Sequence, residues 1–385
     1  MMPAKKGTIL YVGGFEMPDK NAAAHRVISN AKVLNELGYR VIFVGITHED
    51  EVIRQSNYDC FKYFSTPYPK SLSSWFKYLT GFSTISEIAN GIDDLVGIIF
   101  YNYQAIALKK GLSYCCSHGL FSIVDVTEWY LPYGHNPIVR LLKKLDTSLR
   151  MRRYNKRADG IIAISKFLFD YYNSSNCNNI IQVPPLIDKT EKKWKPVTAL
   201  QYNKRIHLVF AGNSYDLKDN LKNIITVVSK YKESIDLKIL GVEKDTLSKT
   251  IPHFGSTQNV VALGKKSHQE CLNYIKSSHF QIFIREDNLV TKAVFPTKLG
   301  ESFACGTPVI TNLSSNIGDY LIEGKNGFIV NGTSPEDIDK VIKMIIRYDS
   351  NILLRMKQYC KGYDCFQLEN YIEPFSELLR NVSKK

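Results

Sequence analysis

Short apolar runs alternate with amphipathic stretches through the first half of the chain. The runs show little alternation with polar residues, which indicates strands buried on both faces of a parallel sheet. They lie at 7–14, 39–46, 95–102, 121–128 and 160–165. Helical spacing of apolar positions follows two of them, at 23–38, where Gly38 ends the pattern, and at 105–119. This βα alternation predicts a doubly wound α/β domain.

The same alternation returns in the second half, after a polar stretch without periodicity at 188–205. Strands are predicted at 206–212, 236–241, 259–264, 279–284 and 308–312. Helices are predicted at 221–231, 270–278 and 335–349, the last with Ser334 as its N-cap before Pro335. We therefore expect an N-terminal domain over 1–190, a C-terminal domain over 191–360 and a final helical segment over 361–385.

Two segments break this alternation. Residues 67–84 are aromatic and basic, and residues 140–157 carry eight basic side chains and one acid. On a helix, Leu141, Leu142, Leu145 and Leu149 would share one face. Residues 140–157 are interpreted either as a solvated helix face or as a contact with anionic lipid or a lipid-diphosphate acceptor. The aromatic cluster from Trp75 to Phe82 is interpreted either as core or a mobile loop, or as a segment that dips into a membrane.

Composition supports a two-domain globular protein with an anionic partner. The chain has 385 residues, more than one core usually supports, and 44% of them are hydrophobic. Its formal charge of +13 favours a nucleotide, an anionic membrane surface or nucleic acid. The eight cysteines lack CxxC spacing, which favours a reducing, cytosolic compartment. The N-terminus does not resemble a signal peptide, and no run approaches the roughly 20 apolar residues of a membrane span.

The stretch from Arg285 to Ile310 is the candidate active site. It joins an apolar run to a loop, a short helical pattern that contains Lys298 and Glu301, and a second apolar run. Helix N-termini offer N–H groups and partial positive charge to phosphates. Thr297 and the backbone of 296–299 are therefore expected to hold phosphate oxygens. The Glu301 carboxylate suits two vicinal ribose hydroxyls, although a glutamate there can also simply complement the helix dipole.

A second phosphate-binding element is predicted about eighty residues earlier. Lys218 lies six residues after Gly212, at or just before a helix start, where an ammonium group can contact a diphosphate. The alternative is a solvated surface lysine.

Four segments carry a resemblance to a known family. They are KNAAAHRVISNAKVLNELGYRVIFVGI, VFAGNSYDLKDNLKNII, FPTKLGESFACGTPVI and IGDYLIEGKNGFIV. Together they resemble glycosyltransferase family 4, whose retaining members have the GT-B fold. The resemblance implies two Rossmann-like, doubly wound α/β domains facing across a cleft, with a C-terminal helix crossing back to the N-terminal domain.

The resemblance also assigns residues. Glu301 corresponds to the second glutamate of the family's paired motif, and Lys218 to its diphosphate-binding lysine. The first glutamate is replaced by Ala293, so Arg285 and Glu286 are candidates to hold the sugar instead. Asn213 stands where a basic residue is common, and Glu128 stands near the position of a family histidine. The remaining residues expected around the nucleotide sugar are Gly14, Arg26, Gly212, Gly264, Pro296, Thr297, Lys298 and Leu299. For Arg26 a structural ion pair is the alternative.

The function implied is retaining, metal-independent hexosyl transfer from a UDP or GDP sugar, with no further cofactor. The acceptor would be a glycan or a polyprenyl-linked molecule in surface polysaccharide synthesis, and the enzyme would be cytoplasmic or peripheral on the anionic inner membrane face. The alternatives are a GT-B sugar-nucleotide epimerase, a catalytically silent partner subunit and a basic nucleic-acid-binding protein. The last is disfavoured because no aromatic and basic recognition module of the usual kinds is present, and nucleic acid is not an expected partner.

Overall fold

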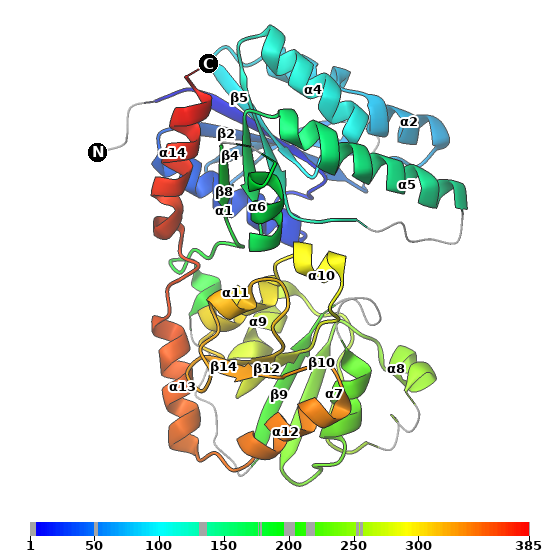
Figure 1. The fold of residues 1–385 in the computed structure, drawn as a ribbon, viewed down its shortest axis with the longest axis vertical. Coiled ribbons are helices and arrows are strands. Elements are labelled where there is room, and N and C mark those ends of the chain that lie inside the picture. The colour runs from blue at the N-terminus through cyan, green and yellow to red at the C-terminus, as the bar shows by residue number, and fades with distance from the viewer. Residues whose placement is uncertain are drawn as a thin grey trace. The chain divides into compact units, whose positions relative to one another are not determined.

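The computed structural model describes residues 5–49, 53–130, 137–175, 177, 179–195, 205–212, 220–251, 254 and 257–384. The chain forms two compact units (Figure 1). The first unit comprises Met1–Leu186, Ala293–Phe295 and Phe366–Lys385, and the second comprises Ile187–Lys292 and Pro296–Cys365. Lys218 and Asn213 lie outside the described residues.

The first unit is built on an eight-stranded sheet in the order β3-β4-β2-β1-β5-β6-β7-β8. Its strands are β1 Thr8–Gly13, β2 Arg40–Thr47, β3 Arg54–Tyr58, β4 Phe61–Pro67, β5 Leu95–Tyr101, β6 Phe121–Val126, β7 Gly160–Ala163 and β8 Ile180–Gln182. Its helices are α1 Ala22–Glu36, α2 Leu72–Thr80, α3 Ser83–Asn90, α4 Ala105–Ser117, α5 Pro137–Leu149, α6 Lys166–Asn173 and α14 Ile372–Val382.

The apolar runs of the sequence form the parallel centre of this sheet, as predicted. Only the pairing of β3 with β4 is antiparallel among the described strands. The sequence pattern did not predict this edge hairpin, because β3 is largely exposed and carries polar residues. Its turn places Asp59 at φ 53°, a left-handed conformation that aspartate tolerates better than most residues.

The C-terminal helix α14 belongs to the core of the first unit. Phe375, Leu378, Leu379 and Val382 are buried in the same cluster as Ile9 of β1. Pro374 lies in the first turn of α14, where its missing N–H costs no hydrogen bond. The proline therefore marks the start of this helix instead of interrupting it.

The second unit has a six-stranded sheet in the order β11-β10-β9-β12-β13-β14, and every pairing recorded between these strands is parallel. Its strands are β9 Ile206–Ala211, β10 Ile235–Leu240, β11 Val260–Ala262, β12 Phe280–Phe283, β13 Val309–Thr311 and β14 Gly327–Ile329. Its helices are α7 Leu221–Val228, α8 Lys244–Thr250, α9 His268–Lys276, α10 Leu289–Ala293, α11 Thr297–Ala304, α12 Pro335–Ile345 and α13 Ser350–Gly362.

Helix ends agree with two details of the sequence pattern. Ser334 is the N-cap of α12, and its side chain accepts a hydrogen bond from the Asp337 N–H, with Pro335 in the first turn. Gly38, just beyond α1, has φ 91°, a conformation that favours glycine at the end of a helix.

Candidate functional site

The carboxyl ends of β9, β12 and β13 form the candidate site of the second unit. These strands are neighbours in the sheet, and Gly212, Arg285 and Asn312 follow them directly or within two residues. Ligands of open parallel sheets bind at this edge. Helix α11 begins at Thr297, and Pro296 before it gives no side-chain cap. Its first turn therefore presents backbone N–H groups and partial positive charge.

Lys298 is held over the ends of β9 and β12 by two aromatic rings. Its Nζ lies 4.8 Å from the ring centroid of Phe210 and 5.7 Å from that of Phe283. A Cβ atom built on Gly212 would lie 3.0 Å from this Nζ. The rings attract the ammonium group, and the glycine leaves room for it. The predicted residues Gly212, Thr297 and Lys298 thus lie at one sheet edge.

Glu301 is paired with a histidine that the sequence analysis did not identify. His268 Nε2 and Glu301 Oε1 are 3.2 Å apart, and both side chains are partly exposed. The histidine is the first residue of α9, whose start is fixed by a capping box between Ser267 and Glu270. That sequence, S-H-Q-E, is the signal that could have placed His268 at a helix start. The pair can present a carboxylate of fixed orientation to a hydroxyl-rich ligand.

Arg285 has a structural role in the loop after β12. Its side chain is buried, and Nη1 lies 3.5 Å from the Thr291 carbonyl oxygen. Its backbone exchanges two hydrogen bonds with the Asn312 side chain, at 2.8 and 2.7 Å. Glu286 is exposed beside it and accepts a hydrogen bond of 2.7 Å from Asn220 Nδ2. Of the two residues expected to replace the missing glutamate, only Glu286 presents its side chain at the surface.

Gly212 and Asn220, the described residues nearest to Asn213 and Lys218, lie at this same edge. Gly212 N donates to the Leu240 carbonyl oxygen at 3.1 Å, and Asn220 N donates to the Ile284 carbonyl oxygen at 2.5 Å. These two residues therefore adjoin β9 and β12.

The other predicted residues of the second unit serve packing or backbone conformation. Pro296 and Leu299 are buried. Gly264 has φ 65°, and a Cβ atom there would lie 2.7 Å from both carboxylate oxygens of Glu243. That carboxylate accepts a hydrogen bond from the Lys265 N–H at 3.0 Å. A side chain at Gly264 would thus disturb this loop.

Ala293 belongs to the first unit. It is fully buried, and its carbonyl oxygen accepts a hydrogen bond of 2.7 Å from Ser165 Oγ of that unit. No carboxylate takes the place of the absent glutamate at this position.

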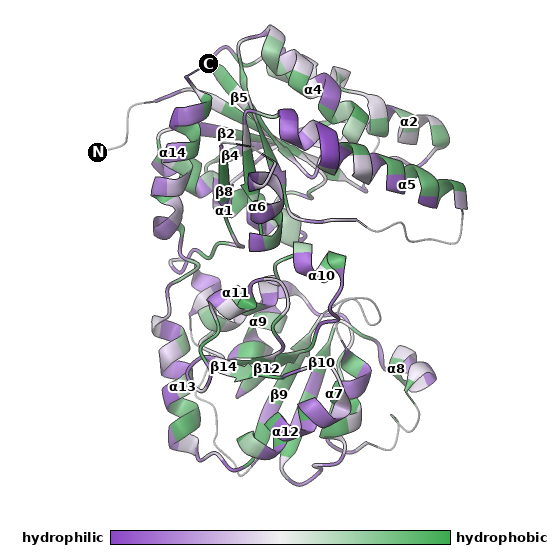
Figure 2. Cartoon of the chain, in the orientation of Figure 1, coloured by the Kyte–Doolittle hydropathy of each residue, from purple (hydrophilic) through white to green (hydrophobic). Residues whose placement is uncertain are grey.

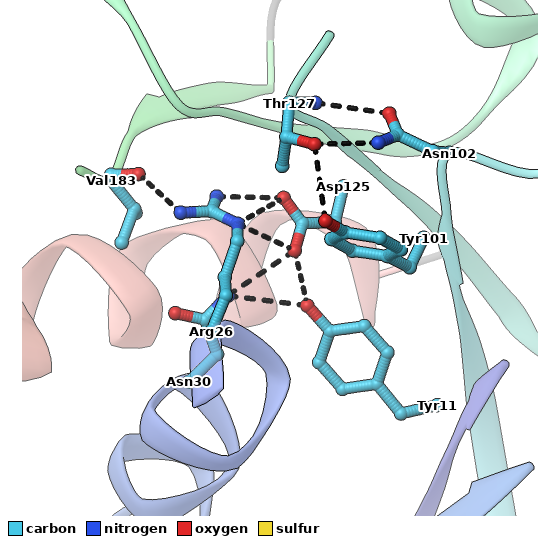
Figure 3. Close-up of polar contacts among 8 residues, drawn as sticks. All are labelled: Tyr11, Arg26, Asn30, Tyr101, Asn102, Asp125, Thr127 and Val183. Carbon is cyan, nitrogen blue, oxygen red and sulfur yellow. Dashed lines mark hydrogen bonds and ion pairs between the residues drawn. The ribbon is translucent and has the colours of Figure 1, made fainter. Parts of the chain in front are cut away.

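Arg26 lies in a buried ion pair within the first unit (Figure 3). Its Nη2 is 2.7 Å from Asp125 Oδ1, and its Nη1 donates to the Val183 carbonyl oxygen at 2.9 Å. Tyr11 and Asn30 complete the cluster by donating to Asp125 Oδ2 at 2.5 and 3.3 Å. Burial, and secondarily the Asp125 charge, raise the pKa of Tyr11 well above its usual value. Arg26 therefore forms the structural ion pair that the sequence analysis gave as the alternative to phosphate binding.

Gly14 and Glu128 lie at the carboxyl edge of the first unit's sheet. Gly14 follows β1, and a Cβ atom there would lie 3.4 Å from the Tyr78 hydroxyl oxygen. Glu128 is half-buried and follows Thr127, which exchanges hydrogen bonds with the Asn102 side chain (Figure 3). These two residues and the Lys298–Glu301 group belong to different units.

Comparison with known proteins finds a family model that matches most of the second unit. Residues 190–362 match the family model for glycosyl transferases group 1. An uncharacterised glycosyltransferase of Methanocaldococcus jannaschii is 25% identical over 205 residues, which is 49% of this chain and 50% of that protein. The chain thus spans about half the length of the curated relative it matches.

Solved structures match nearly the whole chain. Sucrose-phosphate synthase of Thermosynechococcus elongatus has a TM-score of 0.73 at 12% identity, with 97% of this chain and 98% of that chain covered. Anabaena HepE in complex with UDP-glucose has a TM-score of 0.64 at 12% identity, with 97% and 99% covered. These likenesses confirm the predicted two-domain fold. The chain therefore has the two-domain α/β GT-B fold, and its residues 190–362 are similar to glycosyl transferases group 1.

Proposed function

We propose that this protein is a retaining glycosyltransferase of family 4. It transfers a hexosyl group from a UDP or GDP sugar to a glycan or lipid-linked acceptor in surface polysaccharide synthesis. The observation that carries this proposal is the placement of Lys298 and Glu301 on one helix at the carboxyl edge of a parallel sheet, inside the matched family region. The structural relative that binds UDP-glucose supports a nucleotide sugar as the donor.

Each group has a defined role in this proposal. The Lys298 ammonium and the first turn of α11 stabilise the diphosphate as negative charge develops on it, and Lys218 is expected to assist. Glu301, oriented by His268, accepts hydrogen bonds from the ribose hydroxyls. The bond between the sugar C1 and the diphosphate oxygen breaks while the acceptor oxygen bonds to C1 on the same face. The leaving diphosphate takes the acceptor proton, so neither a metal ion nor a separate protein base is required.

The proposal is tested by two substitutions with matched controls. Lys298→Met should lower the transfer rate by about 100-fold or more, because it removes a charge that opposes the developing negative charge. Glu301→Gln should weaken nucleotide binding. Lys232→Met and Glu233→Gln change the same residue types just before β10, at the opposite edge of the sheet, and should alter neither quantity.

Calorimetric titration with UDP- and GDP-sugars, followed by a product assay, separates the alternatives. Nucleotide binding with an epimerised sugar as product would favour the epimerase. Failure to bind any nucleotide sugar would favour a silent partner subunit or a nucleic-acid-binding protein. Wild-type rates in Lys298→Met would refute the assignment of the site.

We further propose that α5 contacts an anionic membrane surface on the cytoplasmic side. Leu141, Leu142 and Leu145 are 50–56% exposed, whereas Thr147 on the other side of the helix is buried. Asp146 fixes this orientation, because its Oδ1 accepts a hydrogen bond of 2.8 Å from the Ala105 N–H at the start of α4. Figure 2 shows that α5 and α2, which both contact α4, each carry hydrophobic residues. All eight cysteines are unpaired, which agrees with a reducing compartment.

Binding to vesicles tests this contact. No helix among the described residues is long and apolar enough to cross a membrane, so contact would be through the surface of the unit. Each lysine near an anionic surface contributes about 1 kcal/mol, so K143Q/K144Q should lower partitioning onto phosphatidylglycerol vesicles by more than tenfold. L141S/L145S should do the same, while L354S, an exposed leucine of α13, should not. Equal partitioning of all variants would contradict the proposal.

A further inference from the structure

A cavity of about 680 Å³ lies within the first unit, at the carboxyl ends of β1, β2 and β4. Gly13, Ile46 and Pro67 line it at these strand ends, and α2 and the start of α3 form its other walls. This volume falls within the range of about 300–1,000 Å³ that small-molecule sites occupy. We name this cavity the α2 pocket. It is distinct from the Lys298–Glu301 site, which belongs to the second unit.

The α2 pocket is positively charged. Lys70 and Lys77 line it, and none of the described lining residues is acidic. Within the described parts of the chain, neither ammonium group forms an ion pair. The start of α3 adds partial positive charge, because Ser83 and Thr84 of its first turn line the pocket and the helix has no side-chain cap. An anionic group in this pocket would therefore meet attraction from three sides.

The same pocket carries aromatic walls. Tyr68 and Tyr78 line it, with their ring centroids 6.0 Å apart, and Trp75 packs edge-on against both at 5.4 and 5.9 Å. Burial raises the pKa of Tyr78 to about 12, so its hydroxyl stays protonated and available as a donor. Aromatic faces pack against the C–H groups of sugar rings, and the hydroxyl groups around them provide hydrogen bonds.

One face of helix α2 lines the pocket, and a different face of the same helix carries exposed apolar side chains. Ser71, Ser74 and Tyr78 follow helical spacing and line the pocket, whereas Leu72 and Phe76 are 91% and 69% exposed and do not. The hydroxyls of Ser71 and Ser74 are used in the capping box of α2, so they shape the wall. The pocket therefore excludes the most exposed apolar side chains of α2, and its polar and aromatic groups stand beside aliphatic ones such as Val44, Ile46 and Ile85.

We infer that the α2 pocket binds an anionic sugar, one that carries a phosphate or a carboxylate group. Lys70, Lys77 and the first turn of α3 hold the anion, and Tyr68 and Tyr78 hold the sugar ring. This inference rests on the proposed function in one respect, the identification of the anionic sugar as part of the acceptor. The binding chemistry itself follows from the lining residues alone.

Calorimetric titration without any nucleotide tests the inference. The probes are α-D-glucose 1-phosphate, glucuronic acid, glucose and inorganic phosphate. We expect one or both anionic sugars to bind at least tenfold more tightly than glucose or phosphate, and the tighter of the two identifies the anion. Equal affinity for inorganic phosphate, or no binding of either anionic sugar, would overturn the inference.

Two variants and a control locate the binding. K70Q/K77Q should weaken the anionic sugar at least tenfold and flatten its salt dependence, since both lysines are exposed and their loss should not unfold the chain. Tyr68→Ala should weaken the sugar phosphate without affecting inorganic phosphate. K109Q/K110Q removes two exposed charges from α4 outside the pocket and should bind as wild type does. Wild-type affinity in K70Q/K77Q would refute the site.

The proposed function is tested separately by nucleotide-sugar binding to the wild-type chain. Anionic sugar binding without nucleotide binding would support the α2 pocket as a sugar site and contradict the proposed transferase function. Nucleotide binding without anionic sugar binding would support the transferase function and contradict the sugar site.

Discussion

The buried pair of Arg26 and Asp125 allows a sharp test of what holds the first unit together. We choose Asp125→Asn, which keeps the shape of the side chain and removes its charge. The Asp125 side chain is 0% exposed and that of Arg26 is 3% exposed, so the variant leaves a guanidinium charge buried without its carboxylate. Breaking such a pair costs about 3–5 kcal/mol, most of it from the uncompensated charge.

A matched control lies in the same unit. Arg40 and Asp94 form a pair with the same 2.7 Å separation, but their side chains are 57% and 49% exposed. Asp94 Oδ1 also accepts a hydrogen bond of 2.7 Å from Thr8 Oγ1, which the amide oxygen of asparagine can still accept. Water replaces the ion pair itself, so Asp94→Asn should cost only about 0–1 kcal/mol. The two substitutions are chemically identical and differ in burial. We therefore expect a difference of about 3 kcal/mol in the free energy of unfolding.

The assay is equilibrium urea unfolding followed by tryptophan fluorescence in a Trp194→Phe background. Trp75 and Trp129 then remain, and both lie in the first unit, so the signal reports that unit. Adding Arg26→Met to Asp125→Asn should recover part of the loss, because it removes the stranded charge.

Asp125→Asn and Asp94→Asn variants that agree within about 1 kcal/mol would refute this reasoning. A loss of stability in the Arg26→Met/Asp125→Asn double variant that equals the sum of the two single losses would refute it as well. Either result would also reopen a ligand-binding role for Arg26.

Three further predictions concern the second unit. Burial lowers the pKa of His279 to about 3 in the folded chain, from an ordinary value of about 6.5. Between these two pH values the unfolded chain binds a proton at His279 and the folded chain does not, so falling pH favours unfolding. Stability should fall by up to about 1.4 kcal/mol per pH unit towards pH 4, and urea titrations of His279→Asn should show a shallower slope. Burial lowers the pKa of Lys357 to about 8, so stability should rise between about pH 8 and pH 10, where only the unfolded chain keeps the proton. The rise should be absent from melting temperatures of Lys357→Met, and its persistence would contradict the assignment. Gly212→Ala should displace the Lys298 ammonium group and weaken UDP-sugar binding while leaving the melting temperature within a few degrees of wild type.

Local patterns predicted most of the fold because the physics that produces these elements is local. Short uninterrupted apolar runs rich in β-branched residues favour strands covered on both faces, and the runs at 95–102 and 279–284 form β5 and β12. The β3–β4 hairpin escaped prediction because an exposed edge strand needs no apolar pattern.

The candidate site was predicted in part. Lys298 and Glu301 follow from a strand, a loop and a helix start that are contiguous in sequence. His268, 33 residues earlier, could not be paired with Glu301, since only the packing of α9 beside α11 brings their side chains within 3.2 Å. The α2 pocket is lined mostly by the aromatic and basic segment 67–84, which the sequence pattern singled out without predicting a cavity. Only the fold brings Gly13, Ile46 and Tyr103 beside that segment to close the pocket.

The sequence by itself determined the two-domain α/β architecture and the order of strand, loop and helix in the Arg285–Ile310 stretch, because both depend on periodicity and on neighbouring residues. Tertiary structure alone decided which charges are available to a ligand. Arg26 and Arg285 carry the residue type that binds phosphate, yet both are buried and bonded within their own units. Lys70 and Lys77 belong to the aromatic and basic segment 67–84, but only the fold shows that they line a cavity. The physical reason is that burial and partners, which a residue's type does not reveal, determine whether its charge is already compensated.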